Sequence, residues 1–318
     1  LKGHFKGGRS LRQGDPLSPF LFMICMEYLS RLIKRKTTLD TNFKYHPMCE
    51  KLKISYLAFA DDLMLLSRGD PHSIQVLMDC LKDFGAKSGL EMNVVKSNIY
   101  LAGVKDDSQA TILDNTNLRC GSMPFRYLGV PLTADRITAR LFDDMIKQIE
   151  GQLSRWNGHT LSYAGRLKLL RSVVQGIVCF WMGIFHLPDI VRTKITQLCR
   201  RFLWGSKSAH VAWDSVCLPR LEGGLGLRDL IAWNQALLTR MLWNMQAKKD
   251  TLWQKWIHNI YLKGNSIWEW EVRPNDSPLF KSLIDIRQTL VERAGSERGA
   301  EALLRGWNSH DRQDGSSK

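Results

Sequence analysis

The sequence is short of acidic residues, of paired cysteines and of long apolar runs, and each shortage excludes a class of protein. Asp and Glu number 31 against 45 Lys and Arg, so the formal net charge is +14 and the pI is about 9.6. The 7 cysteines include no C-x-x-C pair. This argues against a disulfide framework and a standard zinc module, and indicates a reducing, intracellular compartment. The sequence leaves a nuclear and a cytoplasmic location open.

No apolar run reaches the ~18 residues that a membrane span requires. The longest candidate, SVVQGIVCFWMGIFHL, is shorter and is interrupted by Gln175, Gly176 and Gly183. We therefore expect no membrane partner. The basic charge favours a polyanion instead, with nucleic acid as the first choice.

The composition changes along the chain. All 11 tryptophans lie at Trp156 or later, and residues 136–220 hold 13 Lys and Arg against 5 acids. The end of the chain is rich in Gly, Ser and charged residues, which is typical of disorder. We expect four parts: a first part at residues 1–133, a basic helical part at 134–220, a Trp-rich helical part at 221–292 and a disordered tail at 293–318.

Two helices flank a hairpin in the first part. Residues 15–36 read as a helix with Asp15 as its N-cap and Pro16 at its first position. A second helix runs from its cap, Asp70, to Gly89. Apolar runs between and after the helices predict strands. The predicted strands are residues 54–59, 63–67, 98–104 and 125–132, so the expected fold class is α+β with an antiparallel sheet.

Apolar residues at helical spacing predict which faces are apolar. In the first helix, the stripe consists of Leu17, Leu21, Ile24 and Tyr28. After Arg136 a second stripe consists of Leu141, Met145, Ile149, Leu153 and Trp156. Three further tryptophans recur at a spacing of ten, which favours aromatic core ridges between helices over a base-stacking platform. They are Trp233, Trp243 and Trp253.

Two adjacent aspartates, Asp61 and Asp62, sit where the hairpin would turn. A solvent-exposed turn explains them, since Asp is a common turn residue. Ala60, however, precedes them where Gly or Asn is usual, and both flanks are apolar, which places the carboxylates at the edge of a buried sheet. Like charges held there repel one another unless a cation neutralises them. Because Mg²⁺ takes one or two carboxylates plus substrate phosphates, the pair is a candidate site for Mg²⁺ or Mn²⁺.

Four segments, RQGDPLSPFLF, FADD, GLEMNVVKSNIYL and YLGVPL, occur in this order. Together they resemble the palm of reverse transcriptases, specifically those of non-LTR (LINE-type) retrotransposons of plants. The resemblance covers residues 9–132 motif by motif and continues more loosely to Trp270. It implies an RNA-directed DNA polymerase fragment. Its partners would be an RNA template, a DNA primer, dNTPs and the missing N-terminal palm and fingers of the parent polyprotein.

The resemblance also implies an architecture. Residues 1–133 would be a partial polymerase palm, an antiparallel sheet with helices. The basic part at 134–220 would be an all-α thumb, and the Trp-rich part at 221–292 a helical connection region.

The resemblance assigns roles around the aspartates. Asp61 would be a Mg²⁺ ligand and Asp62 its companion. Phe59 stands beside the incoming nucleotide, where the family more often has Tyr. Lys96 matches the region in which a lysine approaches the departing pyrophosphate; read alone, it is a solvated surface residue.

Other matches lie before and after the hairpin. The segment that positions template and nucleotide matches Gln13, Gly14, Asp15, Pro16 and Ser18, although an ordinary capped helix start has the same pattern. The hairpin that grips the primer matches Tyr127, Leu128 and Gly129, which alone read as a strand and turn. Candidate phosphate contacts in the thumb are Arg155, Arg166, Lys168 and Arg171; each alone reads as part of a solvated face.

In this family, a further metal-binding aspartate lies on a strand before the RQGDPLSP motif. Residues 1–14 contain neither Asp nor Glu, and the chain opens at Leu1 as if cut from something longer. We therefore expect the chain alone to be inactive or nearly so. The alternatives are a non-catalytic nucleic-acid-binding remnant, a protein similar to group II intron maturases, and a decayed pseudogene product.

Overall fold

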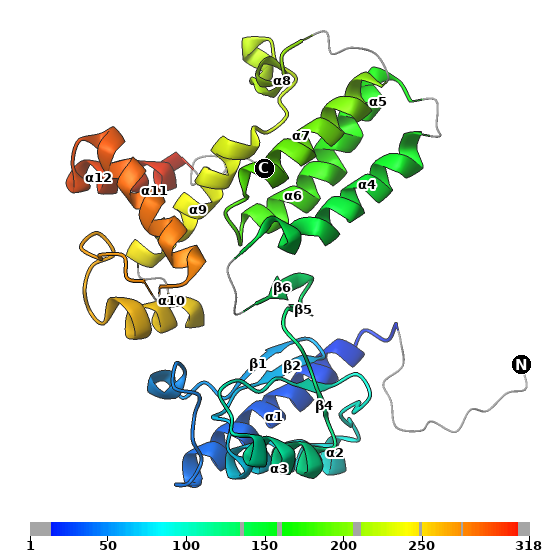
Figure 1. The fold of residues 1–318 in the computed structure, drawn as a ribbon, viewed down its shortest axis with the longest axis vertical. Coiled ribbons are helices and arrows are strands. Elements are labelled where there is room, and N and C mark those ends of the chain that lie inside the picture. The colour runs from blue at the N-terminus through cyan, green and yellow to red at the C-terminus, as the bar shows by residue number, and fades with distance from the viewer. Residues whose placement is uncertain are drawn as a thin grey trace, which may run out of the picture. The chain divides into compact units, whose positions relative to one another are not determined.

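The computed structural model describes residues 14–133, 137–157, 161–205, 211–247, 250–274 and 276–310, the last six of these without their side chains. The described chain is mostly helical, with three small two-stranded sheets (Figure 1). It forms two compact units, one of residues 1–123 and 255–261, the other of residues 124–254 and 262–318. Among the described helices, none combines the length and apolar character that crossing a membrane demands.

The first unit is built on two long helices. Its elements are α1 (Ser18–Leu39), η1 (Glu50–Leu52), β1 (Tyr56–Phe59), β2 (Asp62–Leu65), α2 (Pro71–Ser88), β3 (Asn98–Ile99), α3 (Asp106–Thr116) and β4 (Arg119–Cys120). Strands β1 and β2 pair antiparallel, whereas β3 and β4 pair in parallel.

The second unit is helical apart from one hairpin at its start. Its elements begin with β5 (Phe125–Tyr127), β6 (Val130–Leu132), η2 (Ala139–Phe142), α4 (Asp143–Asn157), α5 (Tyr163–Leu169), η3 (Leu170–Val174), α6 (Gln175–Met182) and α7 (Asp189–Trp204). They continue with α8 (Trp213–Cys217), η4 (Arg220–Glu222), α9 (Leu230–Gln246), α10 (Leu252–Ile257), η5 (His258–Leu262), α11 (Pro278–Ala294) and α12 (Glu297–His310). Residues 255–261 of α10 and η5 belong to the first unit.

The prediction of α+β structure is confirmed only coarsely, because the strands do not join into one antiparallel sheet. The described strands form three separate pairs. The β3–β4 pair is parallel because α3 lies between its strands and supplies the crossover that parallel neighbours need. The strand predicted at 98–104 is only two residues long in the structure. Asn98 and Ile99 are the residues of this segment that pair with β4.

Both helices predicted for the first unit are present. The sequence predicted the two ends of α2 correctly and the N-cap of α1 incorrectly. In α2, Asp70 accepts a hydrogen bond from Ser73 N at 3.1 Å, and Gly89 ends the helix at φ 73°, as predicted. The N-cap prediction for α1 is wrong. Asp15 accepts instead from Leu17 N at 2.8 Å, and the helix begins at Ser18, because that bond closes a turn before the helix starts.

The core of the first unit lies between α1 and α2. Its buried side chains are Leu29, Ile33, Phe43, Leu77, Cys80 and Phe84. The predicted stripe Leu17, Leu21, Ile24 and Tyr28 is exposed instead, together with Phe20 and Met23. Side chains in the second half of α1 therefore make the core, and the first half presents an apolar surface.

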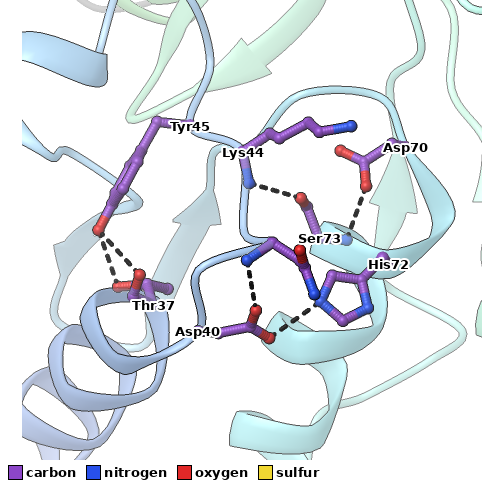
Figure 2. Close-up of polar contacts among 8 residues, drawn as sticks. Thr37, Asp40, Lys44, Tyr45, Asp70, His72 and Ser73 are labelled. Atoms are coloured by element: carbon purple, nitrogen blue, oxygen red, sulfur yellow. Dashed lines mark hydrogen bonds and ion pairs between the residues drawn. The ribbon is translucent and has the colours of Figure 1, made fainter.

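Polar contacts tie the end of α1 to the start of α2 (Figure 2). Asp40 accepts from Asn42 N at 2.8 Å and pairs with His72 Nε2 at 2.9 Å. Ser73 Oγ, at the start of α2, accepts from Lys44 N at 2.8 Å. The pKa of Asp40 lies below its usual range, first because of the Asn42 N–H and then because of His72. The connection between the helices is thus held at both ends.

The largest core of the second unit is formed by α4, η3, α6 and α7 with their neighbours. It includes Met145, Ile149 and Leu153 from the predicted stripe. Trp233 packs against this core and is half-buried, as an aromatic core ridge should be.

A buried amide joins α9 to this core. Asn234 Nδ2 donates to Met182 O at 2.8 Å and to Phe185 O at 2.9 Å. Its Oδ1 accepts from Leu187 N at 3.0 Å. One side chain on α9 thereby satisfies three backbone groups in the turn between α6 and α7, where no helix bond can reach them.

The predicted disordered tail is helical over most of its length. The helix α11 continues to Ala294, and α12 follows at Glu297–His310; residues 311–318 lie outside the described residues. The two helices pack together, and Ala300 and Leu304 are buried. The composition misled because packing against a neighbouring helix, here through the buried Ala300 and Leu304, stabilises a short helix whose own sequence would not form one in isolation.

We expect Asn234→Ala to lower the free energy of unfolding by about 3 kcal/mol, because three backbone groups lose the hydrogen bonds that this side chain makes, two of them buried. Urea denaturation followed by circular dichroism measures the change. Asn244→Ala is the matched control on the same helix, since the Asn244 Oδ1 atom is buried without a partner among the described residues. A loss at Asn244 as large as that at Asn234 would show that the bonds are not the cause.

We expect Asp40→Asn to lower the midpoint of thermal unfolding at neutral pH. The folded-state pKa of Asp40 is lowered, so its contribution to stability is present above about pH 4 and is lost as the pH falls through the folded pKa. Melting curves of both proteins at a series of pH values test this. The difference in midpoint should shrink below about pH 4, and a difference that stays constant down to strong acid would contradict it.

Candidate functional site

The β1–β2 hairpin carries the two adjacent aspartates at its turn. Phe59 pairs with Asp62, so Ala60 and Asp61 are the two central residues of a two-residue loop. The φ angle is positive at Ala60, 51°, and not at Asp61, which is the pattern of a type II′ turn. Such turns usually have Gly at the first central position, so an L-residue there is strained.

The base of the hairpin is fixed and its tip is exposed. Tyr56, Leu63 and Leu65 pack against the core between α1 and α2, and the Tyr56 hydroxyl hydrogen-bonds to Ser30 Oγ on α1. At the other end Asp61 and Asp62 are exposed. The carboxylates therefore stand out from the unit and are not enclosed at the edge of a buried sheet.

An exposed aromatic side chain flanks the aspartates. Phe59 is 61% exposed, although its neighbours Tyr56 and Leu57 on the same strand are half-buried. A ring in this position can pack against a planar group of a ligand that reaches the carboxylates.

The carboxylates of Asp61 and Asp62 are suitable ligands for a hard cation, but they are only two ligands. Within the described parts of the chain, no three His, Cys, Asp or Glu side chains gather to hold a metal. Mg²⁺ commonly binds to one or two carboxylates and completes its shell with substrate phosphates and water. Asp61 and Asp62 fit that mode, and they do not fit a closed protein cage.

The residues predicted to position template and nucleotide lie at the start of α1. Gln13 lies outside the described residues. Gly14 is exposed and has a φ angle of 86°. Asp15 is half-buried, and its carboxylate accepts a hydrogen bond from Leu17 N. Pro16 is exposed. Ser18 is the first residue of the helix. The segment is thus a turn that leads into a helix N-terminus.

Lys96 is exposed in a turn of the first unit. Its backbone N–H donates to Asn93, at 3.1 Å to Oδ1 and 3.2 Å to the carbonyl oxygen. The turn is therefore built by the backbone of Lys96, and the ammonium group is left in solvent.

Tyr127, Leu128 and Gly129 form the turn of the β5–β6 hairpin in the second unit. Tyr127 pairs with Val130, and φ is positive at both Leu128, 51°, and Gly129, 79°. That is the pattern of a type I′ turn. Leu128 and Gly129 are exposed at its tip.

The four candidate phosphate contacts of the second unit divide into two kinds. Arg155 and Lys168 are exposed. Arg166 Nη1 donates to Phe202 O at 3.3 Å, and Arg171 Nη2 donates to Leu225 O. Arg166 and Arg171 therefore donate hydrogen bonds to backbone carbonyls of their own unit. A count of charged residues does not predict such a structural role.

Sequence reasoning missed the strained residue and the exposed apolar face. Ala60 gave a signal, since it occupies a position where Gly is usual. The exposed residues of α1, which include Phe20 and Met23, gave none, because helical periodicity does not tell whether a face is covered.

Residues 2–132 match the family profile described as "Reverse transcriptase (RNA-dependent DNA polymerase)". An Arabidopsis thaliana protein named for ribonuclease H is 34% identical over 140 residues, 42% of this chain and 23% of that protein. The retrovirus-related Pol polyprotein from the type-2 retrotransposable element R2DM of Drosophila melanogaster is 28% identical over 239 residues, 71% of this chain and 21% of the polyprotein. A Pol polyprotein from the type-1 element R2 of Popillia japonica is 23% identical over 327 residues, 95% of this chain and 51% of the polyprotein.

The chain spans less than a quarter of the first two of these relatives. The match to the family profile includes the β1–β2 hairpin and ends at Leu132, the last residue of β6.

We expect Ala60→Gly to raise the free energy of unfolding by about 0.5–1 kcal/mol. Glycine relieves the cost of positive φ and gives part of it back as backbone entropy of the unfolded chain. Urea denaturation measures the change. Ala58→Gly, two residues earlier on the same strand and without positive φ, is the control and should lower stability instead. Destabilisation by both substitutions would mean that the turn is not strained.

Proposed function

Because residues 2–132 belong to the reverse transcriptase family, related to the Pol polyproteins of non-LTR retrotransposons, we propose that the chain is part of an RNA-directed DNA polymerase. In the parent protein a primer 3′-hydroxyl would attack the α-phosphate of a dNTP and release pyrophosphate. The observation that carries the proposal is the hairpin: two exposed carboxylates at a strained turn, fastened to a rigid core. Strain of this kind collects at functional sites.

Asp61 and Asp62 would hold Mg²⁺ or Mn²⁺ against the phosphates of the nucleotide. When bound, the metal would stabilise the negative charge that develops on the attacking and leaving oxygens. Phe59 would pack beside the nucleotide, and the exposed ammonium of Lys96 would meet the departing pyrophosphate. The strands on either side of Asp61 and Asp62 are anchored in the core of the first unit through Tyr56, Leu63 and Leu65, which suits a site that works by positioning.

The architecture proposed with this function is a partial palm at residues 1–133, a thumb at 134–220 and a helical connection region at 221–292. Gly14, Asp15, Pro16 and Ser18 would face template and nucleotide at the start of α1. The tip of the β5–β6 hairpin would contact the primer.

We propose in addition that this chain alone has little or no polymerase activity. Two exposed carboxylates hold Mg²⁺ weakly without further ligands, and the described residues supply no third one to the group. The third carboxylate would come from a preceding strand in a longer chain. A non-catalytic nucleic-acid-binding role is the second candidate, and the exposed cations Arg155 and Lys168 favour it.

Primer extension on an RNA template with Mg²⁺ or Mn²⁺ tests the proposal. We expect background extension from the chain alone, and extension from a chain lengthened by the preceding segment of a relative. In the lengthened chain, Asp61→Asn should reduce the rate by on the order of 100-fold or more, the scale of losing one transition-state stabiliser.

The matched control is the double substitution Asp106→Asn, Asp107→Asn. These adjacent aspartates lie in the first turn of α3 in the same unit and should leave extension unchanged. Robust extension by the chain alone, abolished by Asp61→Asn, would refute the proposed inactivity. Extension by the lengthened chain that survives Asp61→Asn would refute the assignment of the site.

A further inference from the structure

The first half of α1 carries an apolar row on one face. Residues at successive steps of four, three and four, the spacing of a coiled-coil seam, are Leu17, Leu21, Ile24 and Tyr28. Leu17 precedes the helix but already has helical φ and ψ angles, −82° and −22°, so it continues the row. Phe20 lies one turn from Ile24 on the same face. We call these five residues the α1 stripe.

The α1 stripe is open to solvent. Leu17, Phe20 and Ile24 are 65%, 61% and 66% exposed, and Leu21 and Tyr28 are 46% and 36% exposed. Single exposed apolar side chains are common on protein surfaces, but a contiguous apolar patch marks a contact surface. The stripe contains no charged side chain, so a polyanion is not its natural ligand.

The stripe ends at Tyr28, where the core and charged side chains begin. The ring of Tyr28 stacks on Phe84 of α2 at 6.5 Å, and its hydroxyl accepts a hydrogen bond from Lys87 Nζ at 2.8 Å. The exposed ion pair of Glu27 and Arg31, at 2.7 Å, follows on α1. The open apolar surface is therefore about three helical turns long.

We propose that the α1 stripe binds the α1 stripe of a second copy of this chain, with the two helices antiparallel. A two-fold axis would cross α1 midway along the stripe. Leu17 of one copy would then face Tyr28 of the other. Leu21 would likewise face Ile24. Because the same residues meet on both sides, the surface is complementary to itself, as an isologous contact requires.

The area of the stripe suits a second copy. If a fully exposed large apolar residue presents roughly 180 Å², the exposed fractions amount to about 500 Å² per copy. A pair would bury about 1,000 Å² in total, which is the lower limit for a specific interface. We therefore expect a reversible dimer with a dissociation constant in the micromolar range.

The charges of α1 favour the antiparallel arrangement. Its cations gather near its end, at Lys34, Arg35 and Lys36. Antiparallel copies place these two cationic clusters at opposite ends of the pair, whereas parallel copies would bring like charges together. The clusters also lie outside the overlap of residues 17–28, so they stay out of the contact.

Sedimentation velocity of the nuclease-treated full chain, across a wide range of micromolar concentrations, tests the proposal. We expect a monomer–dimer equilibrium that persists at high salt, because the contact is apolar and salt screens only charges. Ile24→Glu should raise the dissociation constant by on the order of 100-fold, since it places two charges at the centre of a symmetric contact.

Leu39→Glu is the matched control. Leu39 is the last residue of the same helix and is 70% exposed, but it lies outside the stripe. The change in charge is the same as in Ile24→Glu, and the dissociation constant should stay as it is. Melts followed by circular dichroism establish that both variants are folded.

Mixing two variants tests the antiparallel register. In the proposed pair, the carboxylate of the Ile24→Glu variant faces the ammonium of the Leu21→Lys variant. We expect each variant alone to be monomeric and the mixture to form a heterodimer. A parallel pair would align each position with itself and offer no such contact, so a mixture that stays monomeric would contradict the register.

Four other results would overturn the proposal. A chain that is monomeric at every concentration would show that a different group covers the stripe, such as a preceding segment of a longer chain. A dimer that survives Ile24→Glu would place the contact elsewhere. A dimer that dissociates at high salt would be held by charges. A monomer that binds phosphatidylcholine vesicles would assign the stripe to a lipid surface.

Self-association is independent of the proposed polymerase function. The contact uses neither Asp61 nor Asp62, so Asp61→Asn should leave the monomer–dimer equilibrium unchanged. Loss of primer extension in that variant, with the same dissociation constant, would leave the dimer in place. Failure of one proposal can therefore be told from failure of the other.

Discussion

The packing of α1 against α2 is the contact on which the first unit depends, because the hairpin and the loop between the helices are both fastened to it. Leu29 and Ile33 meet Leu77 and Phe84 in its core, and the base of the hairpin packs on the same surface. A turn anchored in this way can hold like charges and a left-handed alanine in an exposed position, since the strain is offset by burial elsewhere.

Cations in the second unit serve two purposes that net charge does not separate. Arg166 and Arg171 donate to carbonyls of neighbouring segments and so hold the unit together. Arg155, Arg200 and Arg201 are exposed without ion pairs among the described residues. Only the second group is available to a polyanion. The difference depends on whether a backbone carbonyl lies within reach, which only packing determines.

The features that sequence reasoning predicted well are those set by nearby residues. Asp70 and Gly89 mark the ends of α2 because a cap and a left-handed residue act within one turn. The paired strands around Asp61 follow from the two apolar runs that flank the aspartates. The stripe of α1 was read correctly as a helical face, but Leu17 and Ile24 are exposed. Periodicity shows which side chains share a face and not what covers them.

The sequence by itself indicated the similarity to reverse transcriptases over residues 2–132, the hairpin with its two aspartates, and the basic character of the chain. Motif order, turn chemistry and charge are all properties of neighbouring residues. Tertiary structure alone decided that the aspartates stand exposed, that Asn234 joins α9 to a distant turn, and that the rings of Tyr163 and Trp204 meet. Each of these depends on residues far apart in the chain, and their contacts form only when buried surface elsewhere offsets the entropy of ordering them.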